Sequence, residues 1–95
     1  MIKHVYLIKL KNPDTIDEVM QKLKTLPEFI PQIFRLELGR DFTRVSSSYD
    51  IYQCCEFLSE KDFQAFTKHP YHDEVRRYLA EVREAAVKVD CLLND

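Results

Sequence analysis

The chain has 95 residues, of which 45% are hydrophobic and 32% are charged, with one glycine and four prolines. This composition is typical of an ordinary folded domain and excludes a disordered or fibrous chain. The formal net charge is −2, which provides no field to hold a phosphate backbone, so we do not expect a nucleic-acid partner. A chain of this size buries only about 60 to 65% of the surface that its unfolded form exposes. We therefore expect a single domain over residues 1–95 that forms an oligomer.

The amino-terminal apolar run, Val5 to Ile8, is too short for a signal-peptide core or a membrane span. The three cysteines, Cys54, Cys55 and Cys91, are odd in number and so cannot all pair in disulfides within the chain. The adjacent pair would also point to opposite faces of a strand. We expect reduced cysteines that serve packing, a cytoplasmic location and no membrane partner.

The first predicted elements are a strand and a helix. Residues 2–11 alternate, so that one side of the strand carries Ile2, His4, Tyr6, Ile8 and Leu10. A capping box from Thr15 to Glu18 then begins an amphipathic helix that stops near Pro27.

Two further strands follow. Residues 33–42 predict a second strand with Phe34, Leu36 and Leu38 on one face, and the serine-rich segment after it predicts a loop. Residues 49–58 predict a third strand, of which one face carries Tyr49, Ile51, Gln53, Cys55 and Phe57.

The last third of the chain predicts two helical segments and a strand. A helix begins at Ser59, with Asp62 three residues on, and ends before Pro70, because the residue before proline avoids helical angles. Pro70 suits the first position of a second helix, whose apolar stripe is Val75, Tyr78, Leu79 and Val82. Residues 87–92 predict the final strand.

The order strand, helix, strand, strand, helix, strand predicts an α+β, ferredoxin-like βαββαβ fold with an antiparallel four-stranded sheet. The helices can cover only one face, yet the first and third strands are apolar on both faces. Because exposed apolar patches of that size are rare on monomers, we expect a homodimer in which two sheets pack face to face. The interior of this dimeric α+β barrel is expected to contain Ile2, Tyr6, Ile8, Ile51 and Phe57.

Several segments together carry a family likeness. They are KHVYLIKLK at the start, IPQIFRLELGRD before the second strand, YDIYQCCEF in the third, and HPYH followed by a helix and a final VDC strand. In their order and spacing, the chain resembles the stress-responsive A/B barrel family, or Dabb domains. The resemblance implies a homodimeric barrel with a cavity under the sheet, in a family whose biochemical role is mostly unassigned.

Some members of this family resemble small cofactor-free enzymes, notably plant polyketide cyclases that use a histidine and a tyrosine in the barrel interior. By this resemblance, the second histidine of their motif falls on His72, and the histidine of their first strand falls on His4. The cyclases' tyrosine falls on Phe66, and a further pocket histidine falls on Ile51. The chain departs from the cyclases here, because phenylalanine cannot donate a hydrogen bond to a developing oxyanion.

The histidines of HPYH, His69 and His72, have different expected roles. His69 ends one helix, beside the negative end of its dipole, which favours a structural role. His72 lies in the first turn of the next helix, where a protonated imidazole is disfavoured, so it is either a general base or a structural histidine. His4 shares a strand face with Tyr6, and is either a hydrogen-bonded core residue or part of the same site.

The catalytic candidates are therefore His72, His4 and Tyr6. The residues expected to line a ligand cavity are Ile8, Tyr49, Ile51, Phe57 and Phe66. Asp50, Glu56 and Asp90 alternate out of the expected interior, and the histidine spacing matches no metal-ligand pattern, so we expect no carboxylate pair, metal or cofactor.

Two functions remain open from the sequence. One is a homodimeric barrel that binds a small apolar or aromatic molecule. The other is a cofactor-independent enzyme, polyketide cyclase- or lyase-like or monooxygenase-like, that uses His72 as general base.

Overall fold

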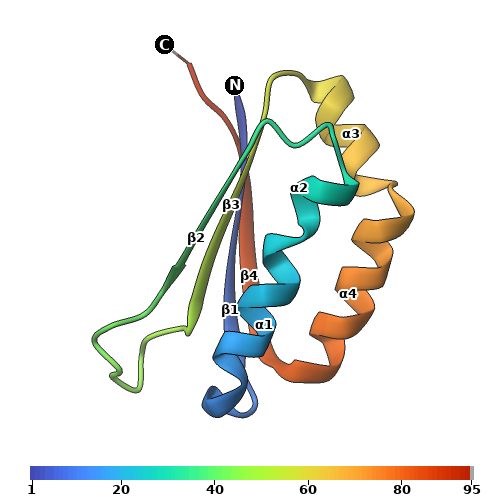
Figure 1. Ribbon diagram of the computed structural model, residues 1–95. Coiled ribbons are helices and arrows are strands. Elements are labelled where there is room, and N and C mark those ends of the chain that lie inside the picture. Colours follow the sequence, from blue (N-terminus) through green and yellow to red (C-terminus); the bar gives the residue numbers. More distant parts are fainter. Residues whose placement is uncertain (95) are drawn as a thin grey trace.

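The computed structural model describes residues 1–94, which form a ferredoxin-like α+β fold (Figure 1). The elements in chain order are β1 (Ile2–Leu10), a 3₁₀ turn (Pro13–Thr15), α1 (Ile16–Lys24), α2 (Leu26–Phe29), β2 (Arg35–Arg40), β3 (Ile51–Phe57), α3 (Glu60–Thr67), α4 (Pro70–Val82) and β4 (Arg83–Leu92). The sheet order is β2-β3-β1-β4 and all three pairings are antiparallel. The fold expected from the sequence is confirmed.

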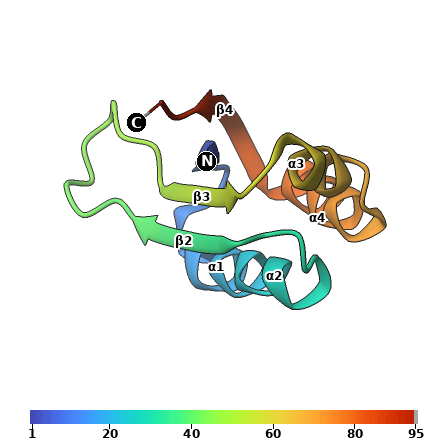
Figure 2. The ribbon, with the colours of Figure 1, turned by 90° about the horizontal axis from the view of Figure 1, so that it is seen from above.

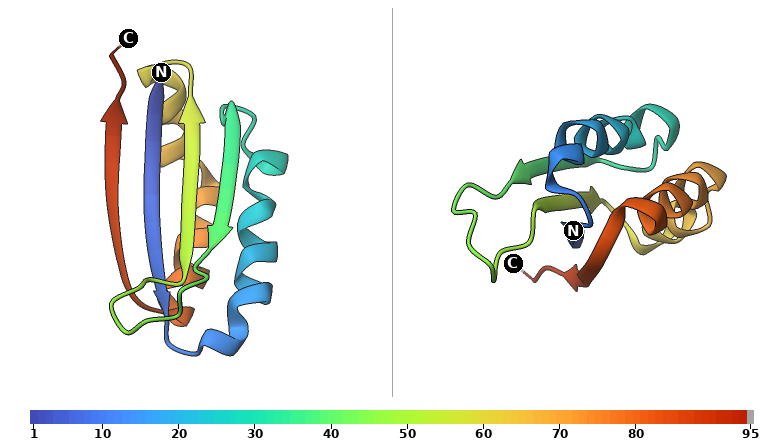
Figure 3. Two further views of the ribbon diagram at one scale, coloured as in Figure 1. Left: turned by 90° about the vertical axis from the view of Figure 1, so that its left-hand side faces the viewer. Right: turned by 90° about the horizontal axis from the view of Figure 1, so that it is seen from below.

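All the helices lie against one face of the sheet (Figure 1). Viewed from above, α3 and α4 lie together on one side, and α1 and α2 lie alongside β2 (Figure 2). The other face of the sheet has no helix over it (Figure 3, left). We call the two sides the covered face and the open face. None of the described helices is long and apolar enough to span a membrane.

The core lies on the covered face. Ile8 and Ile51 are directly opposite each other in the β1–β3 ladder, and both are almost fully buried by the chain's own helices. Ile2 and Phe57 form a second opposed pair, and both belong to the same core. The expected placement of these residues, with Tyr6, between two sheets is therefore wrong. Alternation shows which residues share a face, but it does not show which face the helices cover.

The open face carries the alternate residues. Val5 is opposite Val89 and Leu7 is opposite Val87 in the β1–β4 ladder, and Leu7 is also opposite Tyr52 of β3. Val87 and Val89 are 49% and 52% exposed. An apolar row therefore crosses the centre and one edge of the sheet face over which no described helix lies.

The helix starts differ in part from expectation. Thr15 makes no side-chain cap for α1, because its hydroxyl donates instead to the carbonyl of Asn12. The expected capping box is thus wrong. Ser59 caps α3 as predicted, since its hydroxyl accepts from the backbone N–H of Asp62 at 3.1 Å.

Two strand boundaries also differ. β2 is shorter than predicted, and Phe34 lies before it and is largely exposed. β4 begins at Arg83, directly after α4 ends at Val82, rather than at Val87. Because the helix passes straight into the strand, the Arg83 side chain lies at the junction of α4 and the sheet edge.

Candidate functional site

A pocket of about 300 Å³ opens between the covered face and the helices α3 and α4. This volume is at the lower end of the range for small-molecule sites, roughly 300 to 1,000 Å³. The sheet supplies His4, Tyr6, Gln53, Arg83, Lys88 and Asp90, and the helices supply Leu26, Phe63, Phe66, Thr67, His72, Val75, Arg76 and Leu79. The pocket therefore brings together His4, Tyr6 and His72, the three residues singled out from the sequence.

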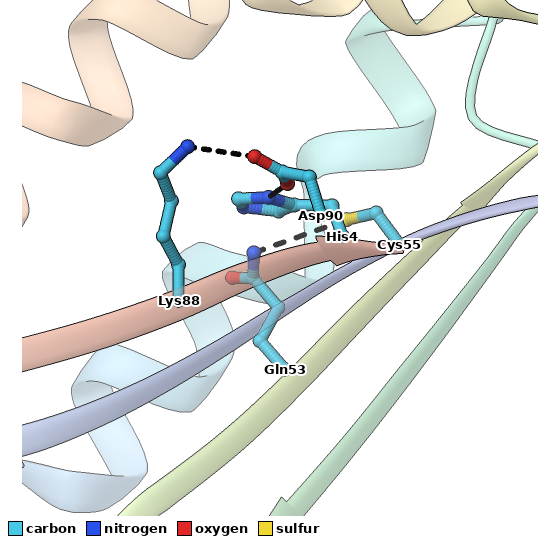
Figure 4. Close-up of polar contacts among 5 residues, drawn as sticks. All are labelled: His4, Gln53, Cys55, Lys88 and Asp90. Atoms are coloured by element: carbon cyan, nitrogen blue, oxygen red, sulfur yellow. Dashed lines mark hydrogen bonds and ion pairs between the residues drawn. The ribbon is translucent and has the colours of Figure 1, made fainter. Parts of the chain in front are cut away.

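His4 forms a pair with Asp90. The two residues are opposite each other in the β1–β4 ladder, and His4 Nδ1 lies 2.5 Å from Asp90 Oδ1 (Figure 4). The other oxygen of this carboxylate accepts from Lys88 Nζ at 2.6 Å. Burial opposes ionisation of Asp90, but the hydrogen bonds from Lys88 and His4 outweigh it and hold the pKa of the carboxyl below its usual value. Asp90 is thus an anion that orients the His4 imidazole.

The expectation that Asp90 points out of the interior is wrong. In β4, the apolar residues Val87 and Val89 face the open side, whereas Lys88 and Asp90 face the helices. The usual rule for a half-covered strand, with apolar residues inward, is reversed here. A polar row on the covered face indicates a site rather than a dry core.

His72 lies in the first turn of α4 and faces the same pocket. Its ring packs against Phe66 with a centroid distance of 4.3 Å, and the His4 ring packs against Phe66 at 5.6 Å. Burial, supported by the charge of Arg76 and by His4, lowers the pKa of His72 below its usual value, although a contact with the Thr67 carbonyl opposes this. The imidazole is therefore neutral at pH 7 and able to accept a proton.

His69 has a structural place outside this pocket. Its Nδ1 accepts a hydrogen bond from the backbone N–H of Tyr71 at 3.1 Å, so His69 is the N-cap of α4. The two histidines of HPYH thus differ in role: the first sets the start of α4, and the second enters the pocket. Residues 1–94 contain no group of three or more His, Cys, Asp and Glu side chains arranged to hold a metal ion.

The Tyr6 hydroxyl is also held in place. It accepts a hydrogen bond from Arg83 Nη1 at 2.5 Å, and it keeps its own proton to donate elsewhere. Tyr6 is therefore a hydroxyl donor within the pocket, whereas Phe66 offers only an apolar wall.

Gln53 is a pocket residue that the site prediction missed. It is opposite Tyr6 in the β1–β3 ladder and only 4% exposed. Its Nε2 makes only a weak contact with Cys55 Sγ at 3.8 Å, and its Oε1 has no hydrogen-bond partner within residues 1–94. Buried amide oxygens nearly always have a partner, so an oxygen without one in a pocket-lining residue is a candidate acceptor for a ligand's hydrogen bond. The sequence does carry a signal for Gln53, because it is the one amide side chain on a predicted strand face that is otherwise apolar or aromatic.

Most of the expected ligand-binding residues do not line the pocket. Ile8, Ile51 and Phe57 are packed in the core, and Tyr49 lies half-buried before β3 begins. Phe66 does line the pocket. The other four were placed by the assumption that the cavity lies between two sheets, and the pocket lies instead between the sheet and its own helices.

Solved structures of several proteins have this fold. A dimeric ferredoxin-like protein of unknown function from Thermobifida fusca is 26% identical, with a TM-score of 0.83, over 97% of this chain and 90% of that chain. A hydroxynitrile lyase from Passiflora edulis is 18% identical, with a TM-score of 0.86, over 99% of this chain and 94% of that chain. A dimeric ferredoxin-like protein of unknown function from Jannaschia is 25% identical, with a TM-score of 0.74, over 97% of this chain and 98% of that chain. No curated protein matches the sequence.

The sequence also matches a family model over nearly its whole length. The match covers residues 2–92, from the start of β1 to the end of β4, and the family is described as the stress responsive A/B barrel domain. It includes both strands that supply His4 and Asp90 and the helix that supplies His72. The chain belongs to the stress responsive A/B barrel domain (Dabb) family, as its resemblance predicted.

Proposed function

We propose that this protein binds a small, partly apolar organic molecule in the pocket between the covered face and helices α3 and α4. The observation that carries the proposal is Gln53, which lines a pocket of about 300 Å³ and whose buried amide oxygen has no hydrogen-bond partner within residues 1–94. An unsatisfied buried acceptor costs about 1 to 3 kcal/mol of stability. A ligand that donates a hydrogen bond to it would recover that free energy.

The remaining lining fits such a ligand. Phe63, Phe66 and Leu79 supply apolar walls, while Tyr6 and His72 supply directed polar groups. Small-molecule sites typically combine a mainly apolar lining with a few fixed polar groups that set orientation. The pocket therefore suits a molecule with a compact apolar body and at least two polar groups.

Substitution of Gln53 by methionine tests this proposal. Methionine has a similar length but no hydrogen-bonding amide, so the free protein should become more stable, while the affinity for pocket ligands should fall. The ligands would be found by NMR screening of small aromatic and alicyclic compounds against the ¹⁵N-labelled protein. Gln32→Met is the matched control, because Gln32 Oε1 also lacks a partner within residues 1–94 but does not line the pocket. Compounds that bind Gln53→Met as well as wild type would contradict the proposal.

A cofactor-independent enzyme is the second candidate, and the paired His4 and Asp90 beside a neutral His72 favour it. A carboxylate that orients an imidazole is a common arrangement in acid/base catalysis. The hydroxynitrile lyase of Passiflora edulis shares the fold, and in a lyase-, cyclase- or monooxygenase-like reaction His72 would be the base that abstracts a proton. Turnover of a pocket ligand by wild type, and its loss in His72→Ala without loss of stability, would support this candidate.

We also propose that the protein is a homodimer with its open faces in contact. Val87 and Val89 are exposed on this face, and monomers rarely leave a large apolar patch in water. Relatives of 25% and 26% identity are described as dimeric. Sedimentation at micromolar concentration should give twice the chain mass of 11.3 kDa. A monomer under these conditions would contradict the proposal.

A cytoplasmic location stays a prediction. The three cysteines, Cys54, Cys55 and Cys91, are free, which fits this location. Disulfides are rare in the cytosol, and fractionation of cells that produce the protein would test the location directly.

A further inference from the structure

We propose that the molecule bound in this pocket is an organic anion, a carboxylate on an apolar body, and that Arg83 binds its charged group. The proposal rests on the proposed function and adds the chemical class of the ligand. It follows from an imbalance of charge among the pocket side chains and from the position of one guanidinium.

The pocket contains three permanent cations, Arg76, Arg83 and Lys88, but only one carboxylate, Asp90. The chain as a whole has a net charge of −2. The positive character is therefore a local property of this site, and it does not reflect a general excess of basic residues.

The one carboxylate cannot balance Arg83. One oxygen of Asp90 contacts His4 at 2.5 Å, and the other contacts Lys88 at 2.6 Å. Arg76 has its own partner outside the pocket, Asp73, at 3.5 Å. Within the described part of the chain, Arg83 has no carboxylate at ion-pair distance, and its side-chain partner is the neutral hydroxyl of Tyr6. Arg83 is thus the pocket cation without a counter-charge.

The geometry of Arg83 suits a ligand anion. The residue lies where α4 passes into β4, and it borders both this pocket and a neighbouring hollow lined by Arg76, Arg77 and Asp73, of which Asp73 pairs with Arg76. A guanidinium has five donors in a planar fork that matches a carboxylate. One donor is used on Tyr6, which leaves the others for the ligand and turns the tyrosine into a second donor for the same anion.

The apolar body of the ligand would lie against Phe66 and Leu79, beyond the charged end. Partly buried ion pairs are stronger than exposed ones, because the surrounding protein lowers the effective dielectric constant. A charged group at Arg83 should therefore contribute more to affinity than the same group on a solvated helix face.

Phenylacetate and phenylacetamide, which have nearly the same shape and differ in charge, test the proposal. NMR titration of the full chain at low salt should show tighter binding of the carboxylate by about tenfold or more, the usual scale for a charge-assisted hydrogen bond. Arg83→Gln should reduce the ratio of the two affinities to near one, and Arg83→Lys should keep part of the preference. Arg77→Gln, which removes a nearby charge that does not line the pocket, should leave the ratio unchanged.

The outcomes separate this proposal from the proposed function. Equal affinities of the two probes in wild type, or a preference that survives Arg83→Gln, would overturn the anion assignment while leaving small-molecule binding intact. Failure of both probes, together with neutral compounds of the same size, to shift any pocket resonance would count against both. If Arg83→Gln does not fold, the wild-type ratio and its decline with added salt decide the matter, because ion pairing is screened and apolar contact is not.

Discussion

The two faces of the sheet are built from the same strands, yet they differ in what completes them. On the covered face, Ile8 and Ile51 are closed off by the chain's own helices, and His4 and Tyr6 line a polar pocket a few residues along the same strand. On the open face, Val5, Leu7, Val87 and Val89 form an apolar row that none of the described helices covers. The chain's own helices complete one face, and we propose that a second copy of the chain completes the other.

The difference between the two sheet faces is clearest in β4. Its apolar residues, Val87 and Val89, point to the open side, while Lys88 and Asp90 point toward the helices. A strand in a solvated two-layer domain would show the opposite pattern. The reversal is explained if the open face is an interface and the polar row is a binding site, so each face supports the interpretation of the other.

The largest expected effect comes from a charge in the covered core. Ile51→Asp places a carboxylate at a position that is 2% exposed, and the free energy of unfolding should fall by at least about 3 kcal/mol, because the buried charge has no partner. Denaturant titration followed by circular dichroism measures this loss. A variant that unfolds like wild type would mean that β3 faces the other way.

A charge on the open face should act on assembly instead. Val89→Asp places a charge without a partner in the proposed apolar interface, and it should weaken association by about 2 kcal/mol or more while the secondary structure is retained. Sedimentation velocity across a range of concentrations would show a shift toward monomer. Val45→Asp, an exposed loop position, is the control and should sediment as wild type does. Unchanged sedimentation of Val89→Asp would place the interface elsewhere.

A smaller effect is expected at the pocket. Asp90→Ala leaves His4 without its partner and should cost about 1 to 2 kcal/mol of unfolding free energy at pH 7. Because the pKa of Asp90 is held below its usual 3.8 in the folded state, the unfolded chain binds the proton more readily, and this contribution is lost as pH falls below that value. The difference in unfolding free energy between wild type and variant should therefore be smaller at pH 3 than at pH 7. A constant gap would show that the charge of Asp90 contributes nothing.

The smallest expected effect belongs to His72. Its pKa is lowered in the folded state, chiefly by burial, so stability from this residue is present above the ordinary pKa of 6.5 and declines as pH falls through that region. His72→Gln removes the titration, so thermal stability should decline less between pH 7 and pH 5 than in wild type. Parallel declines would mean that His72 is solvated rather than buried.

The sequence predicts the fold well, because period-two and period-3.6 patterns are local properties of the chain. It also predicts that His4, Tyr6 and His72 meet, from the strand alternation and the family resemblance. The sequence does not predict whether the strand face that carries them packs against the helices or against a second sheet. Ile2, Ile8 and Phe57 alternate correctly, but only the packing of α1 to α4 decides that they face helices rather than a second sheet.

The residues that the sequence did not identify were missed for physical reasons. Alternation predicts that Asp90 points out of the interior, but the usual preference for apolar burial is reversed in β4, where Val89 faces the open side. Arg83 was not assigned to the sheet, because a strand that continues directly from α4 has no turn signal to mark its start. Gln53 was placed on the correct strand face, but its missing hydrogen bond is visible only in three dimensions.

The central claim is that the polar pocket of the covered face is the binding site, and the imidazole NMR signals test it most directly. Long-range ¹H–¹⁵N spectra of the three histidines would be recorded as phenylacetate is added. We predict that the signals of His4 and His72 shift together with a common dissociation constant, while His69, which caps α4 outside the pocket, stays unchanged. Shifts confined to His69 or to open-face residues such as Leu7 and Val89 would contradict the account.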